Sequence, residues 1–420
     1  MIRKFLLTVA IVVASLTAPY AAWAMDVKVI DADNNTPIDG AIVTTDSTEQ
    51  RANADGVATL TAIPATVRVR ASGYERLDVK RSDLEKQAVV KLKRFDAKAL
   101  YLSSYGATST VLSKGALDVL SAARMNALVI DVKTDRGLVP RDSTSKLAAE
   151  IGSNQGSPIK DLPALVKRYK DQGIYVIARI VTFKDNVLAG KHPEWAVRTK
   201  GGKVYKDRES LMWVDPFRTE AWDYNVAIAV EAAKAGVDEV QFDYVRFPDA
   251  VGMAYSGEWS QAGRVGAIKG FLEKARSALA EYNVFLSADL FGYVAWNTND
   301  TLIGQRIEDL APVLDYISPM LYPSGFQFGI PGHRNPVAAP YAIIYDSLTR
   351  AKERTGLPSR RFRPWLQVFK DYAFGGKAFG PNEVREQVTA ANAFGSSGWM
   401  FWNARNIYHA DDFATIESRN

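Results

Sequence analysis

The chain has 420 residues, of which 47% are hydrophobic and 24% are charged, a composition typical of folded globular proteins and not of disordered ones. Its net charge of +5 comes without a basic stripe, so we expect no nucleic-acid partner. The chain contains no cysteine, and packing without disulfides must therefore hold the fold. Its length leaves room for a core of about 250 residues and a second, smaller domain.

The first 24 residues have the features of a secretory signal peptide. Arg3 and Lys4 precede an apolar run over residues 5–18, and Ala22-Trp23-Ala24 is a small-x-small cleavage site. We therefore expect residues 1–24 to be removed and the mature protein to be secreted or periplasmic, with an uncleaved anchor as the alternative. No later apolar run approaches the roughly 18 residues of a membrane span, so no integral membrane segment is expected after cleavage.

Residues 25–93 contain short alternating runs broken by turn residues, which is the pattern of antiparallel strands joined by tight turns. Three of these segments, residues 38–43, 55–58 and 67–75, resemble the carboxypeptidase regulatory-like modules, which are small seven-stranded sandwiches similar to transthyretin. The resemblance implies a structural or adhesive accessory domain without catalytic residues. Because the pattern changes near residue 95, we expect this domain to fold independently and to be dispensable for activity.

Residues 96–420 alternate between strand-like and helix-like segments. The strand-like runs cover residues 99–103, 127–133, 174–181, 238–246, 284–290, 316–321, 363–369 and 398–403. The helical segments between them cover residues 112–124, 159–172, 216–235, 264–282, 301–313, 341–355 and 382–394. Eight strands separated by seven helices predict an α/β fold, a (β/α)8 TIM barrel whose eighth helix is short or missing. An open doubly wound sheet would usually carry a glycine-rich phosphate loop after its first strand, and residues 103–106 do not form one.

Two aspartates are predicted at the mouth of this barrel, at the C-terminal ends of neighbouring strands. Period-two alternation turns Asp243 on the fourth strand and Asp289 on the fifth into the barrel at the same height. Two converging carboxylates suit glycoside hydrolysis, one as nucleophile or base and the other, with a raised pKa, as acid. A structural ion pair of either aspartate with Arg179 or Arg246 is the alternative.

Further polar and aromatic side chains are predicted to bind a sugar at the same mouth. Sugars present C–H faces that stack on aromatic rings, while their hydroxyls need fixed polar partners. For Asp131 an ion pair with Lys133 or Arg179 is the alternative, and core packing is the alternative for several tryptophans. The predicted substrate-binding residues are Asp131, Arg179, Trp213, Arg246, Trp296, Tyr322, Gln367, Trp402 and Asn403. Asp215, which precedes Pro216 and a helical run, is predicted to be a helix N-cap.

No metal site and no cofactor is predicted. His192, His333 and His409 are far apart in the sequence, and none has a neighbour at metal-ligand spacing. A serine triad of the hydrolase type is not expected either, because no Gly-x-Ser-x-Gly sequence occurs.

Four segments of the second domain resemble those of a bacterial glycosyl hydrolase domain family. They are Phe-Asp-Tyr-Val-Arg-Phe-Pro (242–248), Ser-Ala-Asp-Leu-Phe-Gly (287–292), Ile-Ser-Pro-Met-Leu-Tyr-Pro-Ser (317–324) and Gly-Trp-Met-Phe-Trp-Asn (398–403). The likeness runs from about Lys98 to Tyr408, and the family is a barrel distantly similar to amylase-like glycosidases and to the domain that cleaves poly-N-acetylglucosamine during biofilm export. It implies that Asp243 is the nucleophile and that Asp289 matches a carboxylate on strand five. Glu258, in a loop, is the second candidate for the acid.

Two classes of function remain open at this stage. The first is an exported glycoside hydrolase acting on a polysaccharide or oligosaccharide through paired carboxylates. The second is a non-catalytic carbohydrate-binding barrel, whose accessory sandwich is a spacer or an adhesion module. The fold alone does not decide between them, because one barrel architecture hosts many functions.

Overall fold

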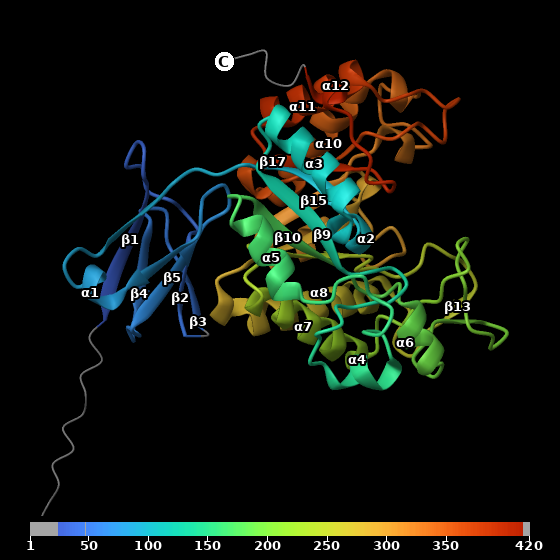
Figure 1. Ribbon diagram of the computed structural model, residues 1–420, viewed down its shortest axis with the longest axis horizontal. Helices are drawn as coiled ribbons and strands as arrows, with labels where there is room; N and C mark the ends of the chain where they lie inside the picture. Colours follow the sequence, from blue (N-terminus) through green and yellow to red (C-terminus); the bar gives the residue numbers. More distant parts are fainter. Residues whose placement is uncertain (1–23, 47, 415–420) are drawn as a thin grey trace, which may run out of the picture.

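The computed structural model describes residues 24–46 and 48–414, which form a small all-β domain followed by a barrel (Figure 1). The predicted signal peptide, residues 1–24, lies outside the described residues except for Ala24. Within those residues, no helix is both long and apolar enough to cross a membrane.

The larger domain is a closed barrel of eight parallel strands, which confirms the predicted (β/α)8 architecture. The barrel order is β10-β12-β14-β15-β16-β17-β8-β9. The strands are β8 (Ala97–Leu102), β9 (Ala127–Lys133), β10 (Tyr175–Val181), β12 (Glu239–Asp243), β14 (Phe285–Phe291), β15 (Tyr316–Met320), β16 (Trp365–Gln367) and β17 (Gly398–Trp402). Each is a buried run with few charges, as expected for strands that are covered on both faces.

Helices surround this barrel and connect its strands. The described helices of this domain are α2 (Ser104–Thr108), α3 (Thr110–Ala122), α4 (Lys146–Ile151), α5 (Leu162–Lys170), α6 (Asn186–Lys191), α7 (Thr219–Lys234), α8 (Gln261–Leu279), α9 (Ile307–Leu310), α10 (Pro340–Thr355), α11 (Pro381–Phe394) and α12 (Ala410–Phe413). Helix α12, after the last strand, has four residues, in line with the short eighth helix expected. Short 3-10 turns extend several connections, among them η1 (Ala280–Tyr282) and η2 (Gly292–Ala295).

Two local predictions are wrong. The segment 301–313 forms only the single helical turn of α9, because Thr301 and Leu302 adopt positive φ and the buried Asp300 carboxylate accepts hydrogen bonds from Arg264 and from Gly304 N. Asp215 is not the N-cap of α7, which begins at Thr219. Its carboxylate instead accepts hydrogen bonds from the backbone N–H groups of Phe217 (3.0 Å) and Ser256 (2.6 Å) and so ties two loops together.

The smaller domain has two sheets, with strand orders β4-β1-β7 and β3-β2-β5-β6. Its elements are β1 (Met25–Asp31), β2 (Ile42–Thr45), β3 (Thr48–Arg51), β4 (Val57–Leu60), β5 (Thr66–Arg70), β6 (Leu77–Lys80), α1 (Arg81–Leu84) and β7 (Val89–Leu92). Valines at alternate positions of β1 and β5, such as Val27, Val29, Val67 and Val69, are fully buried in its core. The strands are not all antiparallel as expected, because β7 pairs with β1 in the parallel sense.

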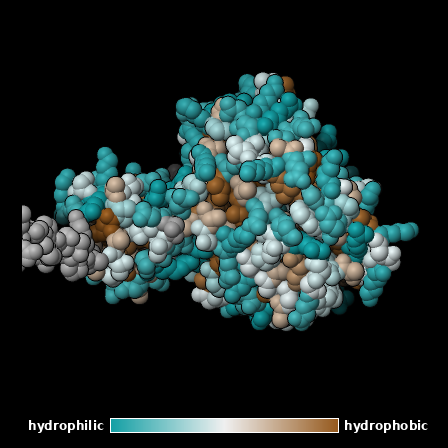
Figure 2. Space-filling view, turned by 90° about the horizontal axis from the view of Figure 1, so that it is seen from below, coloured by the Kyte–Doolittle hydropathy of each residue, from teal (hydrophilic) through white to brown (hydrophobic). Residues whose placement is uncertain are grey.

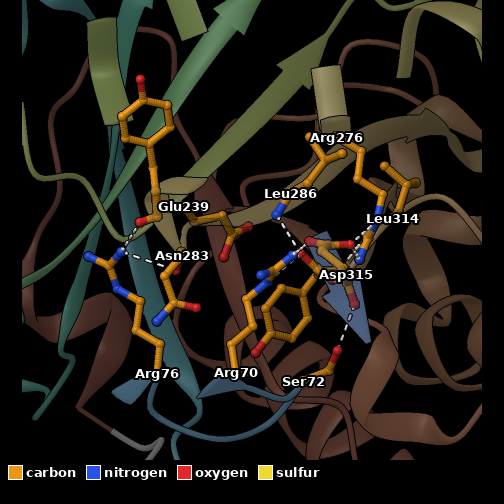
Figure 3. A network of polar contacts seen from close by, with 12 residues as sticks. Arg70, Ser72, Arg76, Glu239, Arg276, Asn283, Leu286, Leu314 and Asp315 are labelled. Atoms are coloured by element: carbon orange, nitrogen blue, oxygen red, sulfur yellow. Dashed lines mark hydrogen bonds and ion pairs between the residues drawn. The ribbon is translucent and has the colours of Figure 1, made fainter. Parts of the chain in front are cut away.

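Buried charges join the two domains at the N-terminal ends of the barrel strands (Figure 3). Asp315, directly before β15, accepts hydrogen bonds from Arg70 of β5 (Nε to Oδ2, 3.2 Å) and from Arg276 of α8 (Nη1 to Oδ1, 3.3 Å). Glu49 of β3 binds the same two guanidinium groups, and Ser72 donates to the Asp315 carbonyl at 2.8 Å. The smaller, two-sheet domain, or sandwich, is therefore docked on the barrel through charged residues that both domains supply.

A second group of contacts surrounds Arg76 in the same region. Its Nη2 donates to the Val237 carbonyl (3.0 Å) and to Asp238 Oδ1 (3.1 Å), and its Nη1 donates to the Asn283 carbonyl at 3.2 Å. Asn283 in turn donates to Asp78 of the sandwich at 2.9 Å. These residues precede β12 and β14, so the sandwich covers the end of the barrel opposite the ends at which an active site is expected.

The sandwich and an extended loop region mark the two ends of the molecule. In Figure 1 the sandwich lies at the left, and the small sheet of β11 (Arg198–Thr199) and β13 (Met253–Ala254) lies at the far right. The face seen in Figure 2 is mostly hydrophilic, with small hydrophobic areas spread over the barrel, and hydrophilic side chains project at that right-hand end. The loops there follow β10 and β12, so they border the mouth of the barrel.

Candidate active site

Asp243 is the last residue of β12 and lies at the mouth of the barrel. Its side chain is almost fully buried, and each of its carboxylate oxygens accepts at least one hydrogen bond. Oδ2 accepts from Arg179 (Nε at 3.0 Å and Nη2 at 2.5 Å), and Oδ1 accepts from the Tyr244 backbone N–H at 2.5 Å. Tyr244 has a φ of 48°, a backbone conformation that non-glycine residues seldom adopt.

Arg179 on β10 connects Asp243 to a second aspartate. Its Nη1 donates to Asp131 Oδ1 at 2.5 Å, and Asp131 also accepts a hydrogen bond from the Tyr101 hydroxyl at 2.5 Å. The guanidinium carbon lies 4.9 Å from the ring centroid of Trp402, which stacks on Tyr101. Burial raises the pKa of Asp131, although Arg179 and Tyr101 oppose this shift. Arg179 is thus held by two carboxylates and by aromatic rings, in a fixed orientation toward Asp243.

Asp289 on β14 is the third aspartate of this cluster. Its Oδ1 accepts a hydrogen bond from the Trp365 indole N–H at 2.7 Å, whereas Oδ2 has no hydrogen-bond partner among the described residues and lies 4.0 Å from Arg179 Nε. Burial, and then the nearby charge of Asp243, raise the pKa of Asp289 well above its ordinary value. This carboxyl therefore keeps its proton to a higher pH than an exposed aspartate does.

A pocket of about 250 Å³ opens above this cluster. Most of its wall is aromatic or apolar, which suits the C–H faces of a sugar ring. Its charged lining residues are Asp243, Arg179 and Arg246. The remaining lining residues are Tyr244, Phe291, Gly292, Tyr293, Met320, Tyr322, Gly325, Phe326, Tyr372 and Trp402.

The structure brings most of the predicted site residues together, but not all of them. Arg179, Asp243, Arg246, Tyr322 and Trp402 line the pocket, and Asp131 and Asp289 lie next to Arg179 without lining it. The Trp213 side chain is buried beside the mouth, where its ring packs on Tyr244 and its N–H donates to Asp207.

Three further predicted binding residues have structural contacts instead. Trp296 donates from its indole N–H to Ser347 of α10 at 2.9 Å, on the outside of the barrel strands. Gln367 is fully buried and bonds the backbone and hydroxyl of Ser324. Asn403 bonds the backbone of its own loop.

The alternative acid, Glu258, is exposed and does not line the pocket. The sequence reasoning also missed several residues of the site. Tyr101 fixes Asp131, and the period-two alternation of β8 is the signal that could have identified it. Trp365, which the sequence does place near the mouth, fixes Asp289. Tyr293, Phe326 and Tyr372 reach the pocket from loops, where no sequence periodicity exists to find them.

No metal site emerges from residues 24–46 and 48–414, in which no group of three or more histidine, aspartate or glutamate side chains is arranged to hold an ion. The cation at the centre of the site is the arginine itself. The pocket can therefore hold one sugar ring between an aromatic wall and the Asp243 carboxyl group, while the Asp289 carboxyl, which does not line the pocket, lies 4.0 Å from Arg179.

Solved structures share this fold. The PgaB (BpsB) glycoside hydrolase domain from Bordetella bronchiseptica is 13% identical with a TM-score of 0.52, and the match covers 77% of this chain and 96% of that chain. Beta-galactosidase from the psychrophilic Marinomonas ef1 is 12% identical with a TM-score of 0.52, covering 73% of this chain and 54% of that one. At these identities the likeness concerns the fold alone.

A hypothetical protein from Ruminiclostridium thermocellum ATCC 27405 is more similar in sequence. It is 36% identical, the match covers 45% of this chain and 96% of that chain, and the TM-score is 0.40. No curated protein matches the chain.

The sequence model of one protein family, described as "Putative glycosyl hydrolase domain", matches residues 99–408. This range contains the three aspartates, Arg179 and the pocket, and it spans more than half of the chain. The chain therefore belongs to this putative glycosyl hydrolase family.

Proposed function

We propose that this protein is an exported glycoside hydrolase that cleaves a polysaccharide or oligosaccharide, with Asp243 as the nucleophile and Asp289 as the acid. The observation that carries the proposal is the pairing of two neighbouring aspartates in opposite environments. Asp243 accepts three hydrogen bonds, two of them from the Arg179 guanidinium, which fix the orientation of its carboxylate at the mouth. Asp289 is buried with one oxygen unpartnered, which favours its protonated form.

In the proposed reaction, a carboxylate oxygen of Asp243 forms a bond to the anomeric carbon while the glycosidic C–O bond breaks. The leaving oxygen takes the proton of Asp289. Water then attacks the glycosyl–Asp243 ester and returns a proton to Asp289, which restores both carboxyl groups. Arg179 holds Asp243 in place, and Trp365 holds Asp289 in place.

The alternative function is a carbohydrate-binding barrel without catalysis, with the sandwich as an adhesive module. The aromatic pocket would serve either function. A binding protein has no need of a buried aspartate with a raised pKa, because such a group destabilises the fold at neutral pH. The catalytic proposal is therefore the better supported of the two.

The test uses the mature chain, residues 25–420, incubated with a panel of bacterial and plant polysaccharides, with new reducing ends as the readout. We expect hydrolysis of at least one polymer and its loss in Asp243→Asn, with binding retained. Asp118→Asn is the matched control, because Asp118 is an exposed residue of α3 whose ion-pair partner in the described part of the chain is Lys114. Binding without hydrolysis by the unaltered protein would favour the binding-module alternative. Export is tested separately, by N-terminal sequencing of the protein from the periplasm or medium, which should begin at Met25.

A further inference from the structure

Arg246 is a cation of the pocket wall that lacks an anionic partner. Its guanidinium lies 5.1 Å from the ring centroid of Trp213 and 5.2 Å from that of Tyr244, and Nη1 donates to the Phe247 carbonyl at 3.1 Å. It forms no ion pair with any residue that the structure describes, whereas Arg179 in the same pocket pairs with two aspartates. The two rings and the carbonyl hold the Arg246 side chain in place. Asp243 and Asp249 line pockets together with Arg246, but neither carboxylate lies within 4.0 Å of its guanidinium nitrogens.

The chain also places unpaired cations beside this mouth. Residues 196–214 form an arm that follows β10, and bridge contacts join Trp213 at its end to Lys184 and Ala196 to Val214. Its two acidic residues, Asp207 and Glu209, both pair with the buried Lys184, at 3.1 and 2.6 Å. Its five cations form no ion pair within the described part of the chain, and these are Arg198, Lys200, Lys203, Lys206 and Arg208.

The arm packs against the pocket wall through the buried side chain of Trp213. Trp213 packs on Tyr244, and Arg246 lies over both rings, so the arm meets the pocket wall at Arg246. A neutral substrate would leave the Arg246 charge without a counter-charge in a partly dehydrated site. A polymer with a negative charge on successive sugars would place one charge at Arg246 and further charges along the arm.

Building on the proposed glycosidase function, we propose that the substrate is a carboxylated polysaccharide containing uronic acid units, and that Arg246 binds the carboxylate of one of these units. The planar guanidinium presents two parallel N–H donors, which match the two oxygens of a carboxylate. The arm cations add an attraction that weakens with salt, because they are exposed to solvent. Arg246 is thereby a specificity-determining residue, distinct from the aspartates that act on the glycosidic bond.

The experiment measures binding and cleavage with matched polymers. The probes are polygalacturonate, alginate and hyaluronate, each beside its carboxyl-reduced form, which keeps the linkages and removes the charge. Binding to the full mature chain carrying Asp243→Asn is measured by titration calorimetry, and cleavage by the unaltered chain is measured by reducing ends. We expect at least one uronate polymer to bind about tenfold or more tightly than its reduced form, as hydrogen bonds to a charged group would give.

Substitution of Arg246 links this preference to one residue. Arg246→Gln should abolish the preference for the charged polymer, Arg246→Lys should retain part of it, and both should keep the unfolding midpoint of the parent protein. Arg350→Gln is the matched control, since Arg350 is an exposed residue of α10 that pairs with Glu353. It should leave the preference unchanged.

The outcomes separate this inference from the proposed function. Equal binding of charged and reduced polymers, or a preference that survives Arg246→Gln, overturns the inference. Cleavage of neutral polymers alone also overturns it while the glycosidase proposal stands. Preferential binding of a uronate polymer without any cleavage supports the inference and counts against catalysis.

Discussion

Asp315 and Asp289 are both buried aspartates of the barrel, at opposite ends of neighbouring strands, and they should affect stability in opposite directions. Burial tends to raise the pKa of Asp315, but Arg70 and Arg276 outweigh it and hold that pKa well below the ordinary value. Asp315→Asn keeps the shape and removes the charge, which leaves Arg70 and Arg276 with Glu49 as the one carboxylate that still pairs with both among the described residues. Removing one partner of a buried ion pair costs about 3–5 kcal/mol, a large part of the roughly 5–15 kcal/mol that stabilises a typical domain.

The sign of the pH dependence follows from the lowered pKa. A carboxyl group whose pKa is depressed in the folded state stabilises the fold above the pKa of the unfolded chain, near 3.9, and loses this effect as pH falls toward its folded pKa. The difference between the unaltered protein and Asp315→Asn should therefore be full at pH 7 and shrink below about pH 4. Urea unfolding, followed by tryptophan fluorescence, measures this difference in the free energy of unfolding. The exposed control Asp118→Asn should stay within about 0.5 kcal/mol of the parent. Equal urea midpoints for Asp315→Asn and the parent at pH 7, or a deficit that persists undiminished at pH 3.5, would refute the reasoning.

Four other outcomes are expected. Asp289→Asn should raise the free energy of unfolding at pH 7. An aspartate whose pKa is raised in the folded state destabilises the fold above about pH 4, where the same carboxyl ionises in the unfolded chain. A lower urea midpoint for Asp289→Asn would contradict this. Asp243→Asn should lower kcat by about a thousandfold or more, roughly 4 kcal/mol of barrier, with an unchanged fold, and near-normal turnover would exclude it as nucleophile. Asp289→Ala should slow glycosides with poor leaving groups far more than activated aryl glycosides; equal slowing would make Glu258 the next residue to mutate. Residues 96–420 expressed alone should remain active but unfold at a lower urea concentration than the full chain, since the truncation removes Arg70 and Arg76. An equal urea midpoint would show that the sandwich contributes nothing to the stability of the barrel.

The sequence predicts the barrel well because the signal that defines it is local. Each barrel strand is an apolar run between turn residues, and the observed bounds of β9, Ala127–Lys133, coincide with the predicted ones. The segment 301–313 was mistaken for a helix because its apolar spacing is helical, while its structure is decided by Asp300. That carboxylate pairs with Arg264, a residue 36 positions away, and no pattern within a short window reveals this contact.

For the site, the sequence predicts which aspartates turn inward but not what they touch. Alternation placed Asp243 and Asp289 inside the barrel, and both are buried there. It could not show that Asp289 binds Trp365 from a strand two positions around the barrel, or that Arg179 binds two aspartates. Contacts of this kind join strands that are far apart in the sequence, and they form only where a side chain is long enough to reach across the barrel interior. Trp296 was expected to bind a sugar because it lies beside a loop. The sequence does not show that the Ser347 hydroxyl of α10 accepts its indole N–H.

The polar groups inside the barrel differ between its two ends. Glu239, at the start of β12, has both carboxylate oxygens bonded, by Ser287 at 2.6 Å and by Tyr175 and Arg363. Asp289, toward the other end, keeps an unpartnered oxygen and a raised pKa, and both features destabilise the folded state. A barrel with charged groups in its interior gives up some of the apolar packing that usually fills such a core. The ion pair of Asp315 with Arg70 of the sandwich lies at the end remote from the pocket, where a rigid contact stabilises the fold without restricting the mouth.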